Sequence, residues 1–125
     1  MPPPKNAFGN LAPWSEPAWY SSLASPYYNE THKQLRDEIR AYTEKNVLPY
    51  SLEWDEKGDA PRAERLKYAR SGFAFADVPT KYRPADVPGL AGIPVADLDI
   101  FHLLVMTDET SRVEGGVMTA LLELL

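Results

Sequence analysis

The fold is decided by residues 28–42, whose sequence is YNETHKQLRDEIRAY. Leu35, Ile39 and Tyr42 recur at spacings of three and four residues, which places them on one face of an α-helix. Asn29 stands immediately before this pattern and is a favourable N-cap residue. The opposite face is charged and predicts two i,i+4 ion pairs, Lys33–Asp37 and Arg40–Glu44.

This first helix is expected to bend at Pro49, because proline lacks the N–H that an interior helical residue donates. The apolar side continues past the proline to Trp54, so the helix should resume and reach about Glu56. A second helix should begin at a cap, Asp59 or Ala60, and end at Gly72. Residues 73–92 are rich in proline and glycine and are predicted to form a loop.

A third helix is expected to begin near residues 95–97 and to contain the apolar run 100–106. Periodicity does not distinguish a buried strand from a buried helix in this run, and helix is favoured because the sequence offers no convincing partner strand. A fourth helix should begin near Gly115 or Gly116. The predicted fold class is therefore all-α, a partial up-down bundle of about four helices.

Residues 1–28 differ in composition from the rest of the chain. They contain six prolines and six aromatic residues. Proline at this density prevents a long helix, and the aromatic residues argue against a free tail. We expect an extended arm over residues 1–28 whose rings dock on a helical domain over residues 29–125. A disordered leader and a proline-motif ligand are the alternatives.

Composition excludes several classes of protein. The formal net charge of −5 speaks against a nucleic-acid-binding surface, which would be basic. The longest apolar run is too short to span a membrane. The absence of cysteine excludes disulfides, thiol catalysis and cysteine-based zinc sites. The N-terminus resembles neither a secretory signal nor an Arg-rich presequence, so we expect an intracellular protein, cytoplasmic or peroxisomal rather than mitochondrial.

Few residues offer catalytic chemistry. The two histidines have no metal-ligand spacing with each other or with a cysteine. His32 lies on a polar helix face and is expected to be solvated. His102 lies in an apolar run and is expected to be a satisfied core or pocket residue, with a catalytic role as the minor alternative. The residues alone therefore predict no catalytic, cofactor-binding or metal site.

Several short motifs follow one another along the chain, and the whole series indicates a protein family more specifically than any single motif does. In chain order, these are Leu48-Pro49, Glu53-Trp54-Asp55-Glu56, Pro61, Gly72, Val78-Pro79-x-x-Tyr82 and Gly116-Val117-Met118-Thr119-Ala120. Over residues 28–125 the series resembles the N-terminal helical domain of the acyl-CoA dehydrogenase family, and the aromatic arm most resembles the fungal members. Two segments depart from the family pattern. The loop glycines are delayed to Gly89 and Gly92, and residues 107–111 replace the usual Glu-Glu-Leu-Ala.

The resemblance implies a flavoenzyme that uses FAD to oxidise an acyl-CoA substrate to the 2,3-enoyl-CoA, in fatty-acid or related acyl-CoA oxidation. It also implies a homo-oligomer in the full-length form. In the family, most FAD contacts and the catalytic glutamate lie in later domains. By position, the resemblance implies that Met118, Thr119 and Leu122 face the acyl chain, and packing against a missing domain is the equal alternative.

The last stretch of the chain, residues 117–125, is apolar and carries no helix stop signal. We therefore expect the truncated first part of a larger enzyme, one that by itself neither turns over substrate nor binds FAD tightly. The other hypothesis is a non-catalytic helical interaction module, or an inert remnant that pairs with a full-length relative. The apolar surface of the same stretch motivates it.

Overall fold

The computed structural model describes residues 9–12, 14–21, 23–87 and 89–122. The α-helices among them are α1 (Ala18–Ser21), α2 (Glu30–Asn46), α3 (Ser51–Lys57), α4 (Arg62–Arg70), α5 (Ile100–Thr110) and α6 (Val117–Leu122). Short 3₁₀ helices lie at Leu48–Tyr50, Phe73–Phe75, Thr80–Tyr82 and Val95–Asp97. Within the described residues the only strand-like pairing is an isolated bridge between Leu90 and Ile93. The prediction of an all-α fold is confirmed.

The first predicted helix is present, with its bend. The Asn29 side chain accepts from the Thr31 N–H at 2.8 Å and caps α2. Pro49 lies in the 3₁₀ turn that separates α2 from α3, which is where its missing N–H is tolerated. Gly58 ends α3 with φ +71°, a left-handed conformation that glycine adopts at low cost.

Two predicted helix starts are wrong. The N-cap of α4 is Pro61, whose carbonyl accepts from the Glu64 and Arg65 N–H groups, and not Asp59 or Ala60. The third helix does not begin at residues 95–97, which form a 3₁₀ turn. It begins at Ile100, because Asp99 supplies the side-chain cap that the earlier turn lacks.

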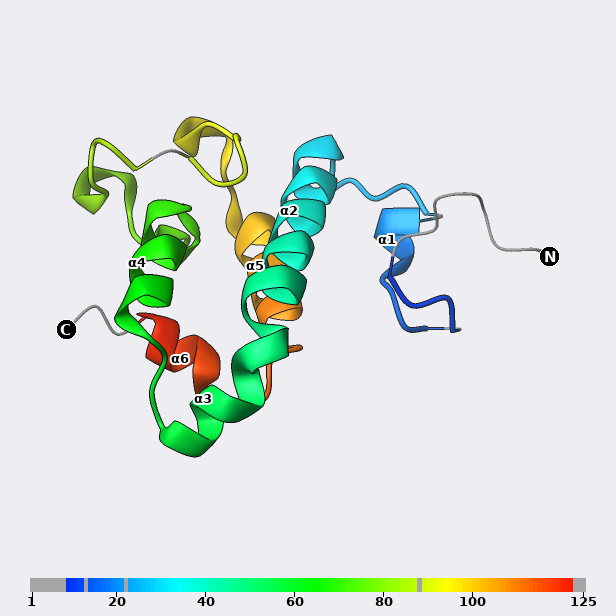
Figure 1. Cartoon of the computed structure of the whole chain (residues 1–125). Coiled ribbons are helices and arrows are strands. Elements are labelled where there is room, and N and C mark those ends of the chain that lie inside the picture. The colour runs from blue at the N-terminus through cyan, green and yellow to red at the C-terminus, as the bar shows by residue number, and fades with distance from the viewer. Residues whose placement is uncertain (1–8, 13, 22, 88, 123–125) are drawn as a thin grey trace.

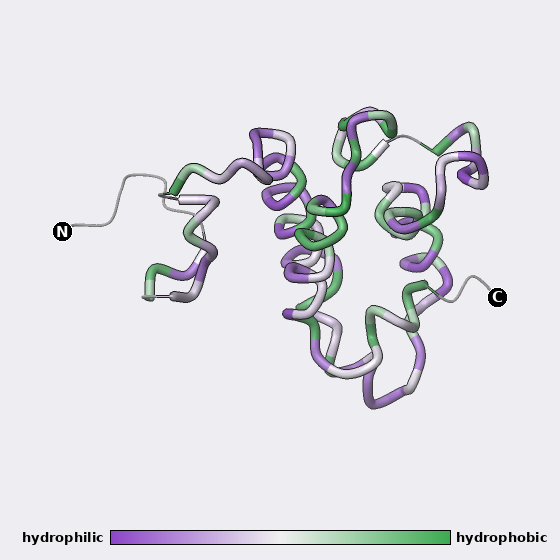
Figure 2. Tube along the Cα trace, turned by 180° about the vertical axis from the view of Figure 1, so that it is seen from behind, coloured by the Kyte–Doolittle hydropathy of each residue, from purple (hydrophilic) through white to green (hydrophobic). Residues whose placement is uncertain are grey.

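The core lies where α2 packs on α5. The two helices run in the same direction, since Thr31 contacts His102 at one end and Arg40 contacts Glu109 at the other. Figure 1 shows α4 returning beside them and α6 placed close to α4 and α3. Figure 2 shows hydrophobic residues along α5, whereas α2 mixes hydrophilic and hydrophobic ones. The buried apolar side chains include Leu35, Ile39, Val105, Val117 and Leu121.

Aromatic rings of the N-terminal arm dock on the starts of α2 and α5. Trp19 stacks on Tyr28 at a centroid distance of 4.1 Å, and Tyr28 meets Phe101 edge-on at 5.4 Å. The Tyr20 hydroxyl donates to Asp37 of α2. Trp14 does not dock, because it is 99% exposed. Docking is thus confirmed for part of the arm, and Phe8 lies outside the described residues.

None of the helices in the described part of the chain is both long enough and apolar enough to cross a bilayer.

Candidate functional site

The three residues expected to face an acyl chain lie together on α6. This helix packs into the core through Val117 and Leu121. Met118, Thr119 and Leu122 occupy the other side, because positions one, three and four residues apart form one arc of a helix. Met118 is half-buried, Thr119 is exposed, and Leu122 is 50% exposed. Thr119 and Leu122 are thus exposed on α6, whereas Met118 packs against the edge of the core.

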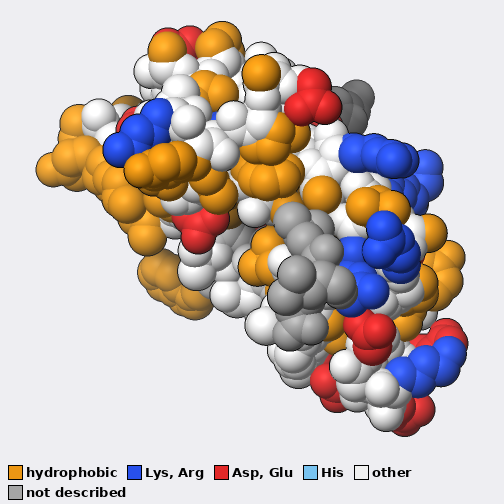
Figure 3. Space-filling model, turned by 90° about the vertical axis from the view of Figure 1, so that its left-hand side faces the viewer, with side chains coloured by type: hydrophobic (Ala, Val, Ile, Leu, Met, Phe, Trp, Pro, Cys, Tyr) orange, Lys and Arg blue, Asp and Glu red, His pale blue; other side chains and the backbone are white. Residues whose placement is uncertain are grey.

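The side of the molecule that carries α4 and α6 is shown in Figure 3. Hydrophobic side chains are exposed there beside a group of Lys and Arg side chains. The cations of α4 are Arg62, Arg65, Lys67 and Arg70. The half-exposed Leu122 side chain can contact an apolar group, but α6 carries no acidic or basic residue that could transfer a proton.

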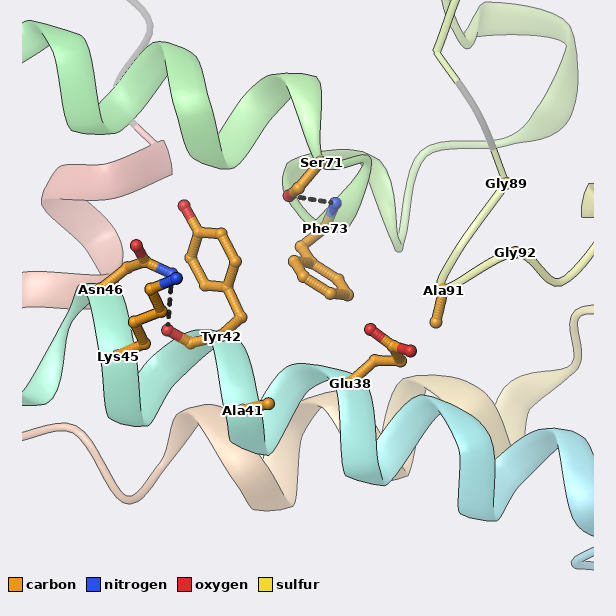
Figure 4. A pocket seen from close by; sticks show the side chains of 10 residues that line it. All are labelled: Glu38, Ala41, Tyr42, Lys45, Asn46, Ser71, Phe73, Gly89, Ala91 and Gly92. Carbon is orange, nitrogen blue, oxygen red and sulfur yellow. Dashed lines mark hydrogen bonds between the residues drawn. The ribbon is translucent and has the colours of Figure 1, made fainter.

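A separate cavity of about 370 Å³ lies between α2, the turn at Phe73–Phe75 and residues 89–92. In Figure 4, the Tyr42 and Phe73 rings form its wall, and the Glu38 carboxylate and the Lys45 side chain lie on either side of Ala41. Burial and the nearby Glu64 raise the pKa of Tyr42 to about 12, so this phenol stays protonated at neutral pH. Met118, Thr119 and Leu122 do not line this cavity.

Two histidines meet at the starts of α2 and α5, although they are 70 positions apart in sequence. His32 Nδ1 accepts from the Asn29 N–H at 3.0 Å, and His102 Nδ1 accepts from the Asp99 N–H at 3.0 Å. Each histidine thus completes a capping box at the third position of its own helix, where Glu or Gln is usual. The prediction that His32 is solvated is wrong, because His32 is 0% exposed.

The two capping boxes also bind each other. His32 Nε2 donates to Asp99 Oδ1 at 2.9 Å, and His102 Nε2 donates to Thr31 Oγ1 at 2.9 Å. These tautomers follow because each Nδ1 accepts a backbone N–H, so that the ring proton lies on Nε2. The two rings stack at 3.8 Å with planes 19° apart. His102 is 1% exposed and fully bonded, which confirms its expected role as a satisfied core residue.

His32, Asp99 and His102 place potential metal-binding atoms within 4.8 Å of one another. Their geometry does not suit a metal ion. A metal binds imidazole nitrogen in the plane of the ring at about 2.0–2.1 Å, and two nearly parallel stacked rings cannot direct lone pairs to one point. Both Nδ1 lone pairs also face backbone N–H groups. The cluster is therefore a structural junction between two helix starts.

The electrostatics of this junction favour a neutral His102 ring and an ionised Asp99 cap. Burial would raise the pKa of Asp99, but hydrogen bonds from His32 and the His102 N–H outweigh burial and lower it. Burial and the neighbouring His32 ring lower the pKa of His102, against the attraction of Asp99. At neutral pH, His102 is thus held uncharged beside a carboxylate.

A buried ion-pair network links α2, α5 and the arm. Arg40 makes two hydrogen bonds to Glu109, at 2.6 and 2.8 Å, and two to Glu16 of the arm, both at 2.9 Å. Arg36 contacts Glu109 and Asp108 at 2.7 Å each. Both predicted i,i+4 pairs are wrong, because the actual partners are Lys33–Glu30, Tyr20–Asp37, Arg40–Glu109 and Arg112–Glu44.

Neither the histidine junction nor the buried ion-pair network was predicted from the sequence, for different reasons. The spacing Asn29-x-x-His32 recurs as Asp99-x-x-His102, and this repeat of a capping box with His at its third position was a recognisable signal. Nothing in the sequence indicated that Glu16 of the arm would reach Arg40.

The fold and its sites define an all-helical domain with an outward apolar helix face and no assembled catalytic centre among the described residues. Residues 29–124 match the family model described as "Acyl-CoA dehydrogenase, N-terminal domain". The chain therefore belongs to the acyl-CoA dehydrogenase family, as the resemblance of its motifs implied.

Curated relatives agree with this assignment. Acyl-CoA dehydrogenase AFT10-1 of Alternaria alternata is 34% identical over 118 residues, covering 91% of this chain and 27% of the relative. Acyl-CoA dehydrogenase apdG of Emericella nidulans is 27% identical over 105 residues, covering 80% and 24%. The probable acyl-CoA dehydrogenase FadE25 of Mycobacterium tuberculosis is 36% identical over 53 residues, covering 42% and 14%. The chain spans about a quarter of the length of the first two relatives. No solved structure gives a significant match.

Proposed function

We propose that residues 29–125 serve as the N-terminal helical domain of an FAD-dependent acyl-CoA dehydrogenase, with residues 1–28 as an arm docked on it. The enzyme would oxidise an acyl-CoA substrate to the 2,3-enoyl-CoA and act as a homo-oligomer. The family match and the relatives' names support this proposal. The observation that carries it is the half-exposed Leu122 on α6, which has Thr119 and the partly buried Met118 beside it.

This face would bind the acyl chain by excluding water from one of its sides. Apolar contact contributes about 25 cal/mol per Å² of surface buried, so the contribution would grow with chain length. Thr119 offers a hydroxyl at the edge of this arc, with Leu122 between it and Met118. The three residues position the substrate and take no part in proton transfer.

FAD is the cofactor that the family implies. The three cavities outlined on the chain measure about 350–390 Å³ each. A drug-sized ligand already needs about 300–1,000 Å³, and FAD is larger than most such ligands. We infer that FAD and the α-proton-abstracting glutamate would be held by other parts of a protein as long as the relatives. FAD, when bound there, would accept the hydride.

The coding sequence after codon 125 is the first test. A frame that continues into a β-domain would support the proposal, and a stop codon would favour the alternative below. In a full-length enzyme, Leu122→Trp is expected to raise KM for long-chain acyl-CoA more than for short-chain acyl-CoA. Leu104→Trp is the matched control, because Leu104 is 50% exposed, as Leu122 is, but lies on α5. Equal effects of the two variants would refute the acyl-facing role.

The chain alone gives a second test. Purified residues 1–125 are expected to show no flavin absorbance band and no acyl-CoA-dependent dye reduction. Either signal would contradict the proposal that FAD and the catalytic glutamate are held by other parts of a longer protein. We further propose a cytoplasmic or peroxisomal location, which imaging of the tagged full-length protein would check.

The alternative function is a non-catalytic interaction module that pairs with a full-length relative. The half-exposed Leu122 on α6 favours it, since such a face can also bind a partner helix. A monodisperse monomer in size-exclusion chromatography, with no binding to a co-expressed full-length relative, would contradict this alternative.

A further inference from the structure

The stacked histidines form the most unusual contact in the described part of the chain. His32 and His102 stack face to face at 3.8 Å, and both are excluded from solvent. Each ring uses Nδ1 to accept the N–H of the residue that caps its helix, and Nε2 to donate to the opposite helix. In its neutral form each ring therefore bonds to both helix starts, and His102 Nδ1 also lies 3.0 Å from Asp99 Oδ1.

Protonation would break these bonds in a defined way. A proton on Nδ1 of His102 would face the Asp99 N–H, so that two donors would oppose each other. The proton would turn instead to Asp99 Oδ1, 3.0 Å away, and the Asp99 N–H would lose the ring as its acceptor. Two imidazolium rings at 3.8 Å would also repel each other with little water between them.

The groups around the two rings cannot neutralise two new charges. Asp99 is the one carboxylate that contacts the rings among the described residues, and its Oδ1 already accepts from His32 Nε2 and from the Phe101 and His102 N–H groups. Its side chain is 47% exposed, so solvent screens part of its charge. From α2 the rings meet the neutral Thr31 hydroxyl, and from the arm the edge of Tyr28.

We propose that His32 and His102 act together as a proton-sensitive latch, which joins the starts of α2 and α5 at neutral pH and releases them, with the docked arm, in mild acid. The arm is included because Tyr28 contacts both His32 and Phe101, and Tyr27 stacks on Phe101 at 5.0 Å. The lowered pKa of His102 agrees with this arrangement.

The sign of the effect follows from linkage. Because the closed junction holds His102 neutral, its stabilisation is complete above the ordinary histidine pKa of 6.5. As pH falls from 6.5 toward the lower pKa of the closed state, the open form binds more protons and gains population. Between pH 7.5 and pH 5.5, one such histidine favours opening by at most about tenfold, the limit in which the closed junction binds no proton.

Amide hydrogen exchange of the full chain tests the latch. Protection factors, each referred to unstructured peptide at the same pH, are compared at pH 7.5 and pH 5.5. The first turns of α2 and α5 are expected to lose up to about tenfold protection, while α4 keeps its own. Unchanged protection at both helix starts, or an equal loss in α4, would overturn the proposal.

The double variant His32→Gln/His102→Gln tests whether the loss of protection requires a titrating ring at these two positions. Glutamine at the third helical position completes a capping box and does not titrate. The variant should therefore show no pH-dependent loss of protection at the two helix starts, and the same loss as the wild type would overturn the proposal. If the variant does not fold, NMR titration of the wild-type ring protons decides, since a His102 pKa of 6.5 or above would also overturn it.

Discussion

Arg40 of α2 and Glu109 of α5 form a two-bond ion pair inside the protein, with Arg40 Nε 2.6 Å and Arg40 Nη2 2.8 Å from the two carboxylate oxygens. Glu109 is 0% exposed, and Arg36 also binds it at 2.7 Å. The contact joins the two parallel helices, and Glu109 is more buried than Glu16 and Asp108, the other carboxylates that face the two arginines.

Glu109→Ala is accordingly expected to lower the free energy of unfolding by about 3–5 kcal/mol. Glu44→Ala is the matched control, because Glu44 pairs with Arg112 at 3.4 Å in an exposed position. That change should stay within about 0.5 kcal/mol. Urea denaturation of both variants measures the difference. Similar losses in the two variants would show that the buried pair has no special role in stability.

Glu16 fastens the arm to α2, so its titration should release the arm. Burial would raise the pKa of Glu16, but hydrogen bonds from Arg40, the Asn10 N–H and Arg36 outweigh burial and lower it from 4.5 to about 2. A lowered carboxyl pKa contributes stability that is complete above pH 4.5 and is lost as pH falls toward 2. The difference in unfolding free energy between the wild type and Glu16→Gln should shrink over this range.

At neutral pH, the same Glu16→Gln variant should expose the arm, since a hydrogen bond to a charged group contributes about 1.5–3 kcal/mol. Chymotrypsin is expected to cut near Trp19 and Tyr20 faster in the variant than in the wild type. Glu30→Gln provides the control, because the Glu30 side chain is 89% exposed and pairs only loosely with Lys33. Equal cleavage rates in Glu16→Gln and Glu30→Gln would contradict the fastening role.

The elements of this fold could be predicted because their signals are local. Three features depend only on neighbouring residues and on the helical period, namely the cap at Asn29, the bend at Pro49 and the end of α3 at Gly58. The contacts of the junction are not local. Thr31 meets His102 across 71 positions and Arg40 meets Glu109 across 69, so burial of these polar residues depends on helix packing that the sequence pattern does not encode.

The two helix caps should differ in strength, although both are capping boxes. Asn29→Ala is expected to cost about 1 kcal/mol, the usual value for a lost N-cap. Asp99→Ala should cost about 2 kcal/mol, because Asp99 also accepts from His32 of the other helix. Thermal denaturation at pH 7.5 compares the two variants. A smaller loss for Asp99→Ala than for Asn29→Ala would show that the link between the helix starts does not stabilise the fold.

Gly89 is a glycine at which a side chain would collide with backbone. A Cβ built there would lie 1.9 Å from the Ile93 carbonyl oxygen, which is backbone and cannot rotate aside. Residues 90–93 form a turn closed by the Ile93 N–H and the Leu90 carbonyl at 2.7 Å, and both of these side chains are buried. Gly89→Ala must therefore displace two core residues and is expected to lower the free energy of unfolding by about 1–3 kcal/mol.

The matched control for this change is Gly116→Ala. Nothing lies within 4 Å of a Cβ at Gly116, and its backbone is not in the left-handed region. Alanine there should be neutral or stabilise the chain by up to about 1 kcal/mol, because it reduces the conformational entropy of the unfolded state. Urea denaturation of both variants distinguishes the steric clash expected at Gly89 from the general effect of replacing a glycine by alanine. A Gly89→Ala variant as stable as Gly116→Ala would mean that the turn at residues 90–93 can move without disturbing the core.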